Sequence, residues 1–223
     1  MDRRTEDLVA DDMTMMWDEV ADIGLLLHEL DDASFDRPSL CEDWAVRDVL
    51  GHMSVGHTTP LPEMVVRIGR YGFNVTKASF TESQRFAAGK SPAELREFWD
   101  TVMVAQHPRK GISKMIPANA GFLDHLVHHQ DIRRPLGAHR DVPEERLVRA
   151  LELTATVGNK MFNPKRTVAE LRLEPTDVPW SSGDGPLVRG PGEAIVMAAA
   201  GRRVALDDLS GDGVGVLQER LGG

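Results

Sequence analysis

Apolar residues recur at helical spacing over the first two thirds of the chain. Between residues 12 and 31 they stand three and four positions apart, as one buried stripe of a long helix requires; they are Met13, Met16, Val20, Ile23, Leu27 and Leu30. The same spacing predicts helices in the segment after Asp43, which can cap the first turn, and over residues 91–105, 119–134 and 142–158. Ser91 and Glu94 form a capping-box pattern with Pro92 between them, which fixes one of these helix starts.

The pattern changes in the last third of the chain. Residues 169–191 alternate apolar and polar positions around prolines and the turn sequence SSGDG, which is typical of short strands. A helix of small residues over 192–201 and a terminal helix over 211–221 follow. We therefore expect a helical bundle of four or more helices over residues 1–158 and a small α+β domain over residues 159–223.

Composition narrows the possible functions. The net charge of −9 disfavours a nucleic-acid partner, because the surface as a whole repels phosphate. Cys41 is the only cysteine, so no disulfide can form within the chain, and no apolar run is long enough to span a membrane. The amino-terminal segment does not resemble a signal peptide. We expect a cytoplasmic protein that does not bind membranes.

Residues 124–137, DHLVHHQDIRRPLG, concentrate histidine and aspartate within one predicted helix. At 100° per residue, two pairs stand one turn apart on a shared face: Asp124 with His128, and His125 with His129. Either pair could supply two ligands to a cation, and imidazole with carboxylate suits zinc, nickel or iron(II). Asp124 and His128 also lie opposite the apolar arc of the helix, so an ordinary water-facing surface is an alternative interpretation.

A third ligand would have to come from another helix. The candidates are His52 and His57, in the segment VLGHMSVGH. His57 falls on the buried stripe of its helix, and a histidine at such a position is usually a hydrogen-bonded core residue. Cys41, in the loop before this helix, is expected to be a small buried apolar residue.

Three motifs resemble a known family. In PSLCEDWAVRDVLGHM, His52 follows Trp44, Arg47–Asp48 and Leu50. In the histidine-rich helix, an acidic residue is followed by histidine four positions later and then by aspartate: Asp124, His128 and Asp131. The segment from Trp180 to Arg202 ends in Gly-Arg. In this order the motifs resemble the mycothiol-dependent maleylpyruvate isomerase family, which belongs to the DinB-like superfamily of metal-binding bundles and adds a small sterol-carrier-like domain.

The resemblance implies a function and a set of site residues. A divalent metal, zinc before nickel or iron, would be held by His52, Asp124 and His128, with Arg202 as a catalytic residue. The expected activity is a metal-dependent transferase or isomerase that uses a small thiol, mycothiol if the source is actinobacterial, on a small electrophilic substrate. A monomer or homodimer is expected. The alternative is a DinB-like metal-binding stress or regulatory protein without catalysis.

One residue departs from the family pattern. The family usually has glutamate at the position of Asp124, and aspartate is one methylene shorter. Its carboxylate could fall short of the metal, so the His125/His129 pair remains an alternative set of ligands.

Overall fold

The computed structural model describes residues 3–158 and 162–222. It contains two compact units, Met1–His139 and Arg140–Gly223. Each is described by itself below.

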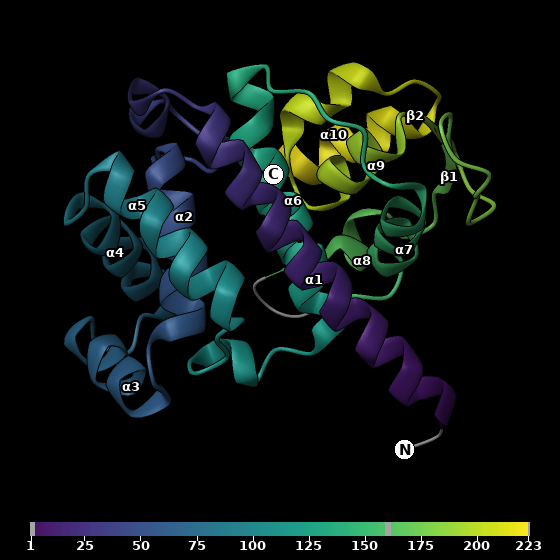
Figure 1. Ribbon diagram of the computed structural model, residues 1–223. Coiled ribbons are helices and arrows are strands. Elements are labelled where there is room, and N and C mark those ends of the chain that lie inside the picture. Colours follow the sequence, from purple (N-terminus) through teal and green to yellow (C-terminus); the bar gives the residue numbers. More distant parts are fainter. Residues whose placement is uncertain (1–2, 159–161, 223) are drawn as a thin grey trace. The chain divides into compact units, whose positions relative to one another are not determined.

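The first unit is built around helix α6 (Ala118–Leu136). The long helix α1 (Arg3–Glu29) crosses it, as Figure 1 shows, and α2 (Val46–Thr58) contacts it as well. Apolar side chains of α1, α2, α5 (Pro92–Phe98) and two short helical segments, η1 (Asp32–Asp36) and η2 (Trp99–Val104), form a fully buried core with Ile132 of α6. The larger members are Ile23, Leu26, Leu27, Phe35, Leu50, Trp99 and Met103. The helical stripes predicted from the sequence are therefore the faces that meet in this core.

Helices α2 and α4 (Val75–Ala88) pack against each other at very short range. A Cβ atom added at Gly51 would approach the backbone oxygen of Ser83, so no larger residue fits there. Helix α4 begins at Asn74, whose side chain accepts a hydrogen bond from the Lys77 amide. This close contact fixes the position of His52, which follows Gly51 in α2.

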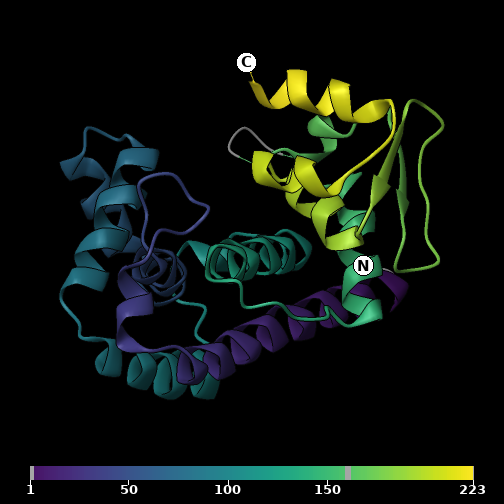
Figure 2. The same ribbon diagram turned by 90° about the horizontal axis from the view of Figure 1, so that it is seen from above.

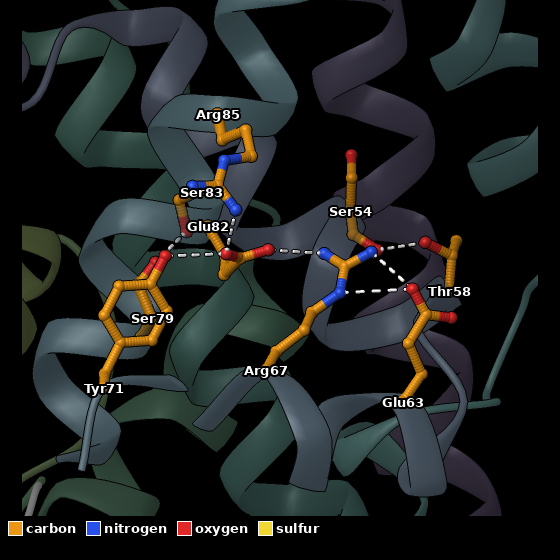
Figure 3. Close-up of polar contacts among 9 residues, drawn as sticks. All are labelled: Ser54, Thr58, Glu63, Arg67, Tyr71, Ser79, Glu82, Ser83 and Arg85. Carbon is orange, nitrogen blue, oxygen red and sulfur yellow. Dashed lines mark hydrogen bonds and ion pairs between the residues drawn. The ribbon is translucent and has the colours of Figure 1, made fainter. Parts of the chain in front are cut away.

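Helix α3 (Leu61–Arg70) has no buried residue, and it is attached to α4 by charge. Figure 3 shows Glu82 of α4 accepting hydrogen bonds from Arg67, Arg85 and Tyr71, each at 2.8 Å. Glu82 is only 3% exposed, whereas both arginines reach solvent. A buried carboxylate between two guanidinium groups is compensated within the fold.

Several predicted boundaries are confirmed. The capping box of Ser91 and Glu94 begins α5, which continues into a π-helical segment, η2 (Trp99–Val104). Helix α6 ends at Gly137, whose φ of 66° is the left-handed conformation that glycine adopts without strain. The prediction for Asp43 was wrong, because α2 begins at Val46 and Asp48 accepts the hydrogen bond of the Ala45 amide. Two short 3₁₀ helices, η1 (Asp32–Asp36) and η3 (Ile112–Lys114), complete the unit.

The second unit combines short helices with one parallel strand pair. Strands β1 (Arg172–Pro175) and β2 (Leu187–Gly190) lie side by side in Figure 2 and pair in register, Arg172 with Leu187. Helix α7 (Glu144–Thr154) packs against α9 (Gly192–Ala199). The other elements are α8 (Pro164–Thr167), η4 (Arg203–Asp208) and α10 (Gly213–Gly222).

The predicted fold class, a helical bundle followed by a small α+β part, is confirmed. The sequence pattern placed the domain boundary between residues 158 and 159, which adjoins residues 159–161, outside the described residues. The compact units instead divide between His139 and Arg140, because α7 packs with α9 in the second unit. Among the described residues, no helix combines the length and the apolarity that a membrane span needs.

Candidate metal centre

Helix α6 is buried around most of its circumference. His128, His129, Gln130 and Asp131 are each at most 8% exposed, although the helical wheel places Asp131 and His128 opposite the apolar arc. The alternative of a water-facing surface is therefore wrong for these residues. Buried polar side chains need partners, and those partners define the possible chemistry of the helix.

The structure brings together the three metal ligands expected from the sequence. One ligand atom each of His52, Asp124 and His128 lies within 4.8 Å of the other two. Asp124 Oδ1 lies 3.6 Å from His128 Nε2, close to the separation of about 3.4 Å between two ligand atoms of one tetrahedral zinc ion. Aspartate at residue 124 is thus long enough to reach the group.

Hydrogen bonds orient two of these ligands. Asp131 Oδ2 lies 2.9 Å from His128 Nδ1, on the side of the ring away from Asp124, and Ser79 Oγ lies 3.2 Å from His52 Nδ1. A carboxylate behind a histidine is the usual arrangement for a metal ligand, because it fixes the ring and its tautomer. Asp131 is part of the sequence motif, but nothing in the sequence indicated Ser79.

Cys41 is a polar member of this site rather than only a small apolar residue. Its side chain is partly buried against the core, and its thiol donates a hydrogen bond to Asp131 Oδ2 at 3.2 Å. Its Sγ also lies 3.8 Å from His128 Nδ1. Cys41, His128 and Asp131 form a second group of possible ligands, on the opposite side of the same imidazole. The loop before α2 delivers Cys41 to α6, which no local pattern could show.

Electrostatics at His128 favour its charged form in the absence of a metal. Burial by itself lowers the pKa of His128, but the Asp124 carboxylate and the hydrogen bonds to Asp131 and Cys41 raise it well above its ordinary value. A positive charge is therefore stabilised at this position. A bound divalent cation would meet the same negative surroundings.

The other face of α6 is closed by its own partners. His129 Nδ1 lies 2.9 Å from Glu19 of α1, and Arg133 Nε donates to His129 Nε2 at 2.7 Å. His129 and Glu19 are fully buried. Because these contacts occupy both ring nitrogens, His129 offers no lone pair to a cation. The alternative ligand pair of His125 with His129 is thus disfavoured by the geometry.

His125 instead meets His57, which is buried and is hydrogen-bonded through its Nδ1 to the Pro108 oxygen. Their Nε2 atoms lie 3.1 Å apart, and Trp17 packs edge-on against His57. Burial lowers the pKa of both rings, and with the neighbouring His57 it brings the pKa of His125 to about 4. Both imidazoles are therefore neutral at physiological pH unless they bind a cation.

Arg202 belongs to the second unit. It follows Gly201, whose φ of 96° turns the chain at the end of α9. Its guanidinium donates to the backbone oxygen of Ala200 at 2.9 Å. This contact holds one edge of the group.

Comparison with known proteins finds one family model that matches part of the chain. Residues 16–107 match the family model described as the mycothiol maleylpyruvate isomerase N-terminal domain. The matched residues include the His52 motif, and the match supports the resemblance predicted from the sequence motifs. No curated protein matches the sequence significantly.

Solved structures agree on the fold. The chain is similar to the crystal structure of the mycothiol-dependent maleylpyruvate isomerase, with a TM-score of 0.55, 15% sequence identity and 92% of each chain covered. A mutant of that enzyme, with one histidine replaced by alanine, matches with the same values. At this identity the likeness establishes the shared fold.

Proposed function

We propose that this protein is a metal-dependent and thiol-dependent isomerase or transferase, with mycothiol as its thiol and a small electrophile as its substrate. The convergence of His52, Asp124 and His128 is the observation on which the proposal depends. Two imidazoles and one carboxylate are the donor set of a catalytic zinc site and leave positions for exogenous ligands. Nickel and iron(II) accept the same donors.

The bound cation would lower the pKa of a coordinated thiol, so that thiolate is present at neutral pH. The chain's own residues orient the site. Asp131 holds the His128 ring, and Ser79 holds the His52 ring. Trp44 packs against His52, and Phe80 stacks on Trp44, so an aromatic wall shields one side of the site from water.

Isomerisation needs no oxidant and no net consumption of thiol. A thiolate adds to one carbon of a conjugated double bond, and the electron pair moves to the adjoining carbonyl. The resulting single bond rotates, the electrons return and the thiolate leaves. Transfer would use the same attack on an electrophile that carries a leaving group. We assign to Arg202 the binding of a substrate carboxylate or of the polar part of the thiol, since guanidinium groups bind carboxylates in a bidentate manner.

The direct experiment is an assay of zinc-, nickel- and iron-loaded protein with mycothiol and maleylpyruvate, extended to a panel of electrophiles. We expect thiol-dependent turnover that is lost in His52→Ala and His128→Ala but retained in the surface variant His139→Asn. Arg202→Ala should keep its metal and lose rate, corresponding to about 2–4 kcal/mol in the barrier.

A metal-binding protein without catalysis is the second candidate, because shared fold does not fix activity. It predicts the same metal content with no turnover on any electrophile in the panel. Full metal occupancy together with complete inactivity would therefore favour that candidate and contradict the enzyme proposal.

A further inference from the structure

His57 of α2 and His125 of α6 form a buried pair that the three proposed metal ligands do not include. Both residues are 3% exposed, and their rings meet edge to face at 89°. The Nε2 atoms face each other at 3.1 Å. At their other ends, His57 Nδ1 lies 2.8 Å from the Pro108 oxygen and His125 Nδ1 lies 2.7 Å from the Gly121 oxygen.

The contacts of these two rings need one more proton than two neutral imidazoles carry. A backbone oxygen only accepts hydrogen bonds, so each Nδ1 must donate. A neutral imidazole has one N–H, which leaves both Nε2 atoms as acceptors directed at each other. The three contacts need three protons, whereas two neutral rings supply two. A cation between the Nε2 atoms removes the conflict.

The arrangement matches that of metal-binding histidines. Such histidines usually donate the N–H that faces away from the metal to a carboxylate or a backbone oxygen, as both rings do here. Two metal–nitrogen bonds of about 2.0–2.1 Å place their nitrogens about 3.1–3.4 Å apart at angles near tetrahedral, which agrees with the observed separation.

Asp124 places negative charge near His125, although it approaches the ring at Nδ1 and not at the proposed ligand atom Nε2. Its Oδ1 lies 3.6 Å from His128 Nε2, and its Oδ2 lies 4.0 Å from His125 Nδ1. One carboxylate thus lies next to a histidine of each group. Its charge would partly offset the cost of placing a second cation among buried side chains.

We propose that His57 and His125 bind a second divalent cation, of the first-row type that imidazole prefers, through their Nε2 atoms. This position is separate from the one proposed at His52, Asp124 and His128, and the Asp124 carboxylate lies near a histidine of each. The inference shares Asp124 with the proposed function but does not depend on thiol chemistry.

Anomalous diffraction from crystals of the zinc-loaded wild-type protein, recorded on both sides of the zinc edge, tests this directly. We expect one zinc peak at each histidine group and, by elemental analysis, about two zinc ions per chain. His57→Asn should lose the peak at His125 and retain zinc at His52, which lowers the content to about one. His139→Asn, a matched replacement of an exposed histidine, should keep both.

The outcomes separate this inference from the proposed function. Zinc at His52, Asp124 and His128 alone overturns the second site and leaves the first. Zinc at His57 and His125 alone supports the second site and contradicts the first, and zinc at neither contradicts both. If His57→Asn does not fold, as circular dichroism would show, the wild-type anomalous map still decides the question.

Discussion

The first unit contains two buried polar clusters that differ in how their charges are balanced. In the Glu82 cluster, one carboxylate is bound by Arg67, Arg85 and Tyr71, all from the chain itself. In the histidine cluster, nitrogens of His52 and His128 converge with the Asp124 carboxylate, and we propose that a bound cation balances the charge. The Glu82 cluster joins α3 to α4, whereas the histidine cluster presents ligand atoms.

The same contrast occurs along α6 itself. His129 gives both nitrogens to Glu19 and Arg133, whereas one turn earlier His125 faces another histidine. Burial is nearly equal for the two residues. Burial therefore does not identify a histidine as a candidate metal ligand. The partners of its two ring nitrogens decide whether one of them can bind a cation.

Loss of a proposed ligand should have the largest effect. In His128→Ala the site keeps two of its three ligands, and we expect zinc affinity to fall more than 100-fold, beyond the roughly 10–100-fold typical of residues that only orient a ligand. Competition with a chelating dye measures this. His129→Ala is the matched control, because it should destabilise the fold without a comparable loss of zinc affinity. Equal affinity losses in the two variants would remove the distinction between them.

Glu82→Gln should affect stability and leave metal binding unchanged. The substitution leaves two arginines facing a buried neutral group, and we expect the free energy of unfolding to fall by about 2–3 kcal/mol, since both arginines can partly rehydrate. Urea denaturation of the metal-free protein measures this. Glu63→Gln removes the exposed partner of Arg67 and should cost about 1 kcal/mol or less. A drop in zinc content in Glu82→Gln would show that the two clusters are coupled.

Asp131→Asn tests the orienting carboxylate of the histidine cluster. It removes the charge behind His128 but retains the size of the side chain, so zinc affinity should fall about 10–100-fold. Isothermal titration of the metal-free protein gives the change directly. An affinity equal to that of the wild type would mean that Asp131 serves only to accept the hydrogen bond of the partly buried Cys41 thiol.

The smallest expected effect on stability concerns an exposed carboxylate, that of Glu94. Hydrogen bonds from the backbone and side chain of Ser91 lower the pKa of Glu94 below its ordinary value of 4.5. A lowered pKa in the folded state means that Glu94 contributes stability above pH 4.5, and that this contribution is lost as the pH falls through the folded-state pKa. Glu94→Gln should therefore be slightly less stable than the wild type at neutral pH. In urea titrations the difference should disappear as the pH falls below the folded-state pKa, and a difference that grows toward low pH would contradict this account.

Local patterns predicted most of the helices but not the contacts that make the site. The stripe of α1, the Ser91 capping box and the end of α6 at Gly137 follow from periodicity and turn chemistry. Helices α3 and α4 were not predicted, although Leu61, Met64 and Ile68 of α3 stand at helical spacing; in the structure α3 has no buried residue, and its Arg67 pairs with Glu82 of α4.

The histidine-rich helix shows the limit of periodicity most clearly. A helical wheel compares one side with the other, so it cannot recognise that α6 is enclosed and that His128 and Asp131 are buried. The grouping of His52, Asp124 and His128 came from motif resemblance. Cys41 and Glu19 reach α6, and Ser79 reaches His52 of α2, from distant parts of the chain, and only the tertiary fold reveals these contacts.

The most direct test of the central claim, that this cluster binds a metal which accepts a thiol, is electronic absorption of the cobalt-substituted protein. Adding mycothiol should produce a sulfur-to-cobalt charge-transfer band, because the thiol binds as thiolate at a position left open by His52, Asp124 and His128. The band should be absent in His52→Ala and present in His139→Asn. A cobalt-loaded wild-type protein whose spectrum does not change with saturating thiol would contradict the account.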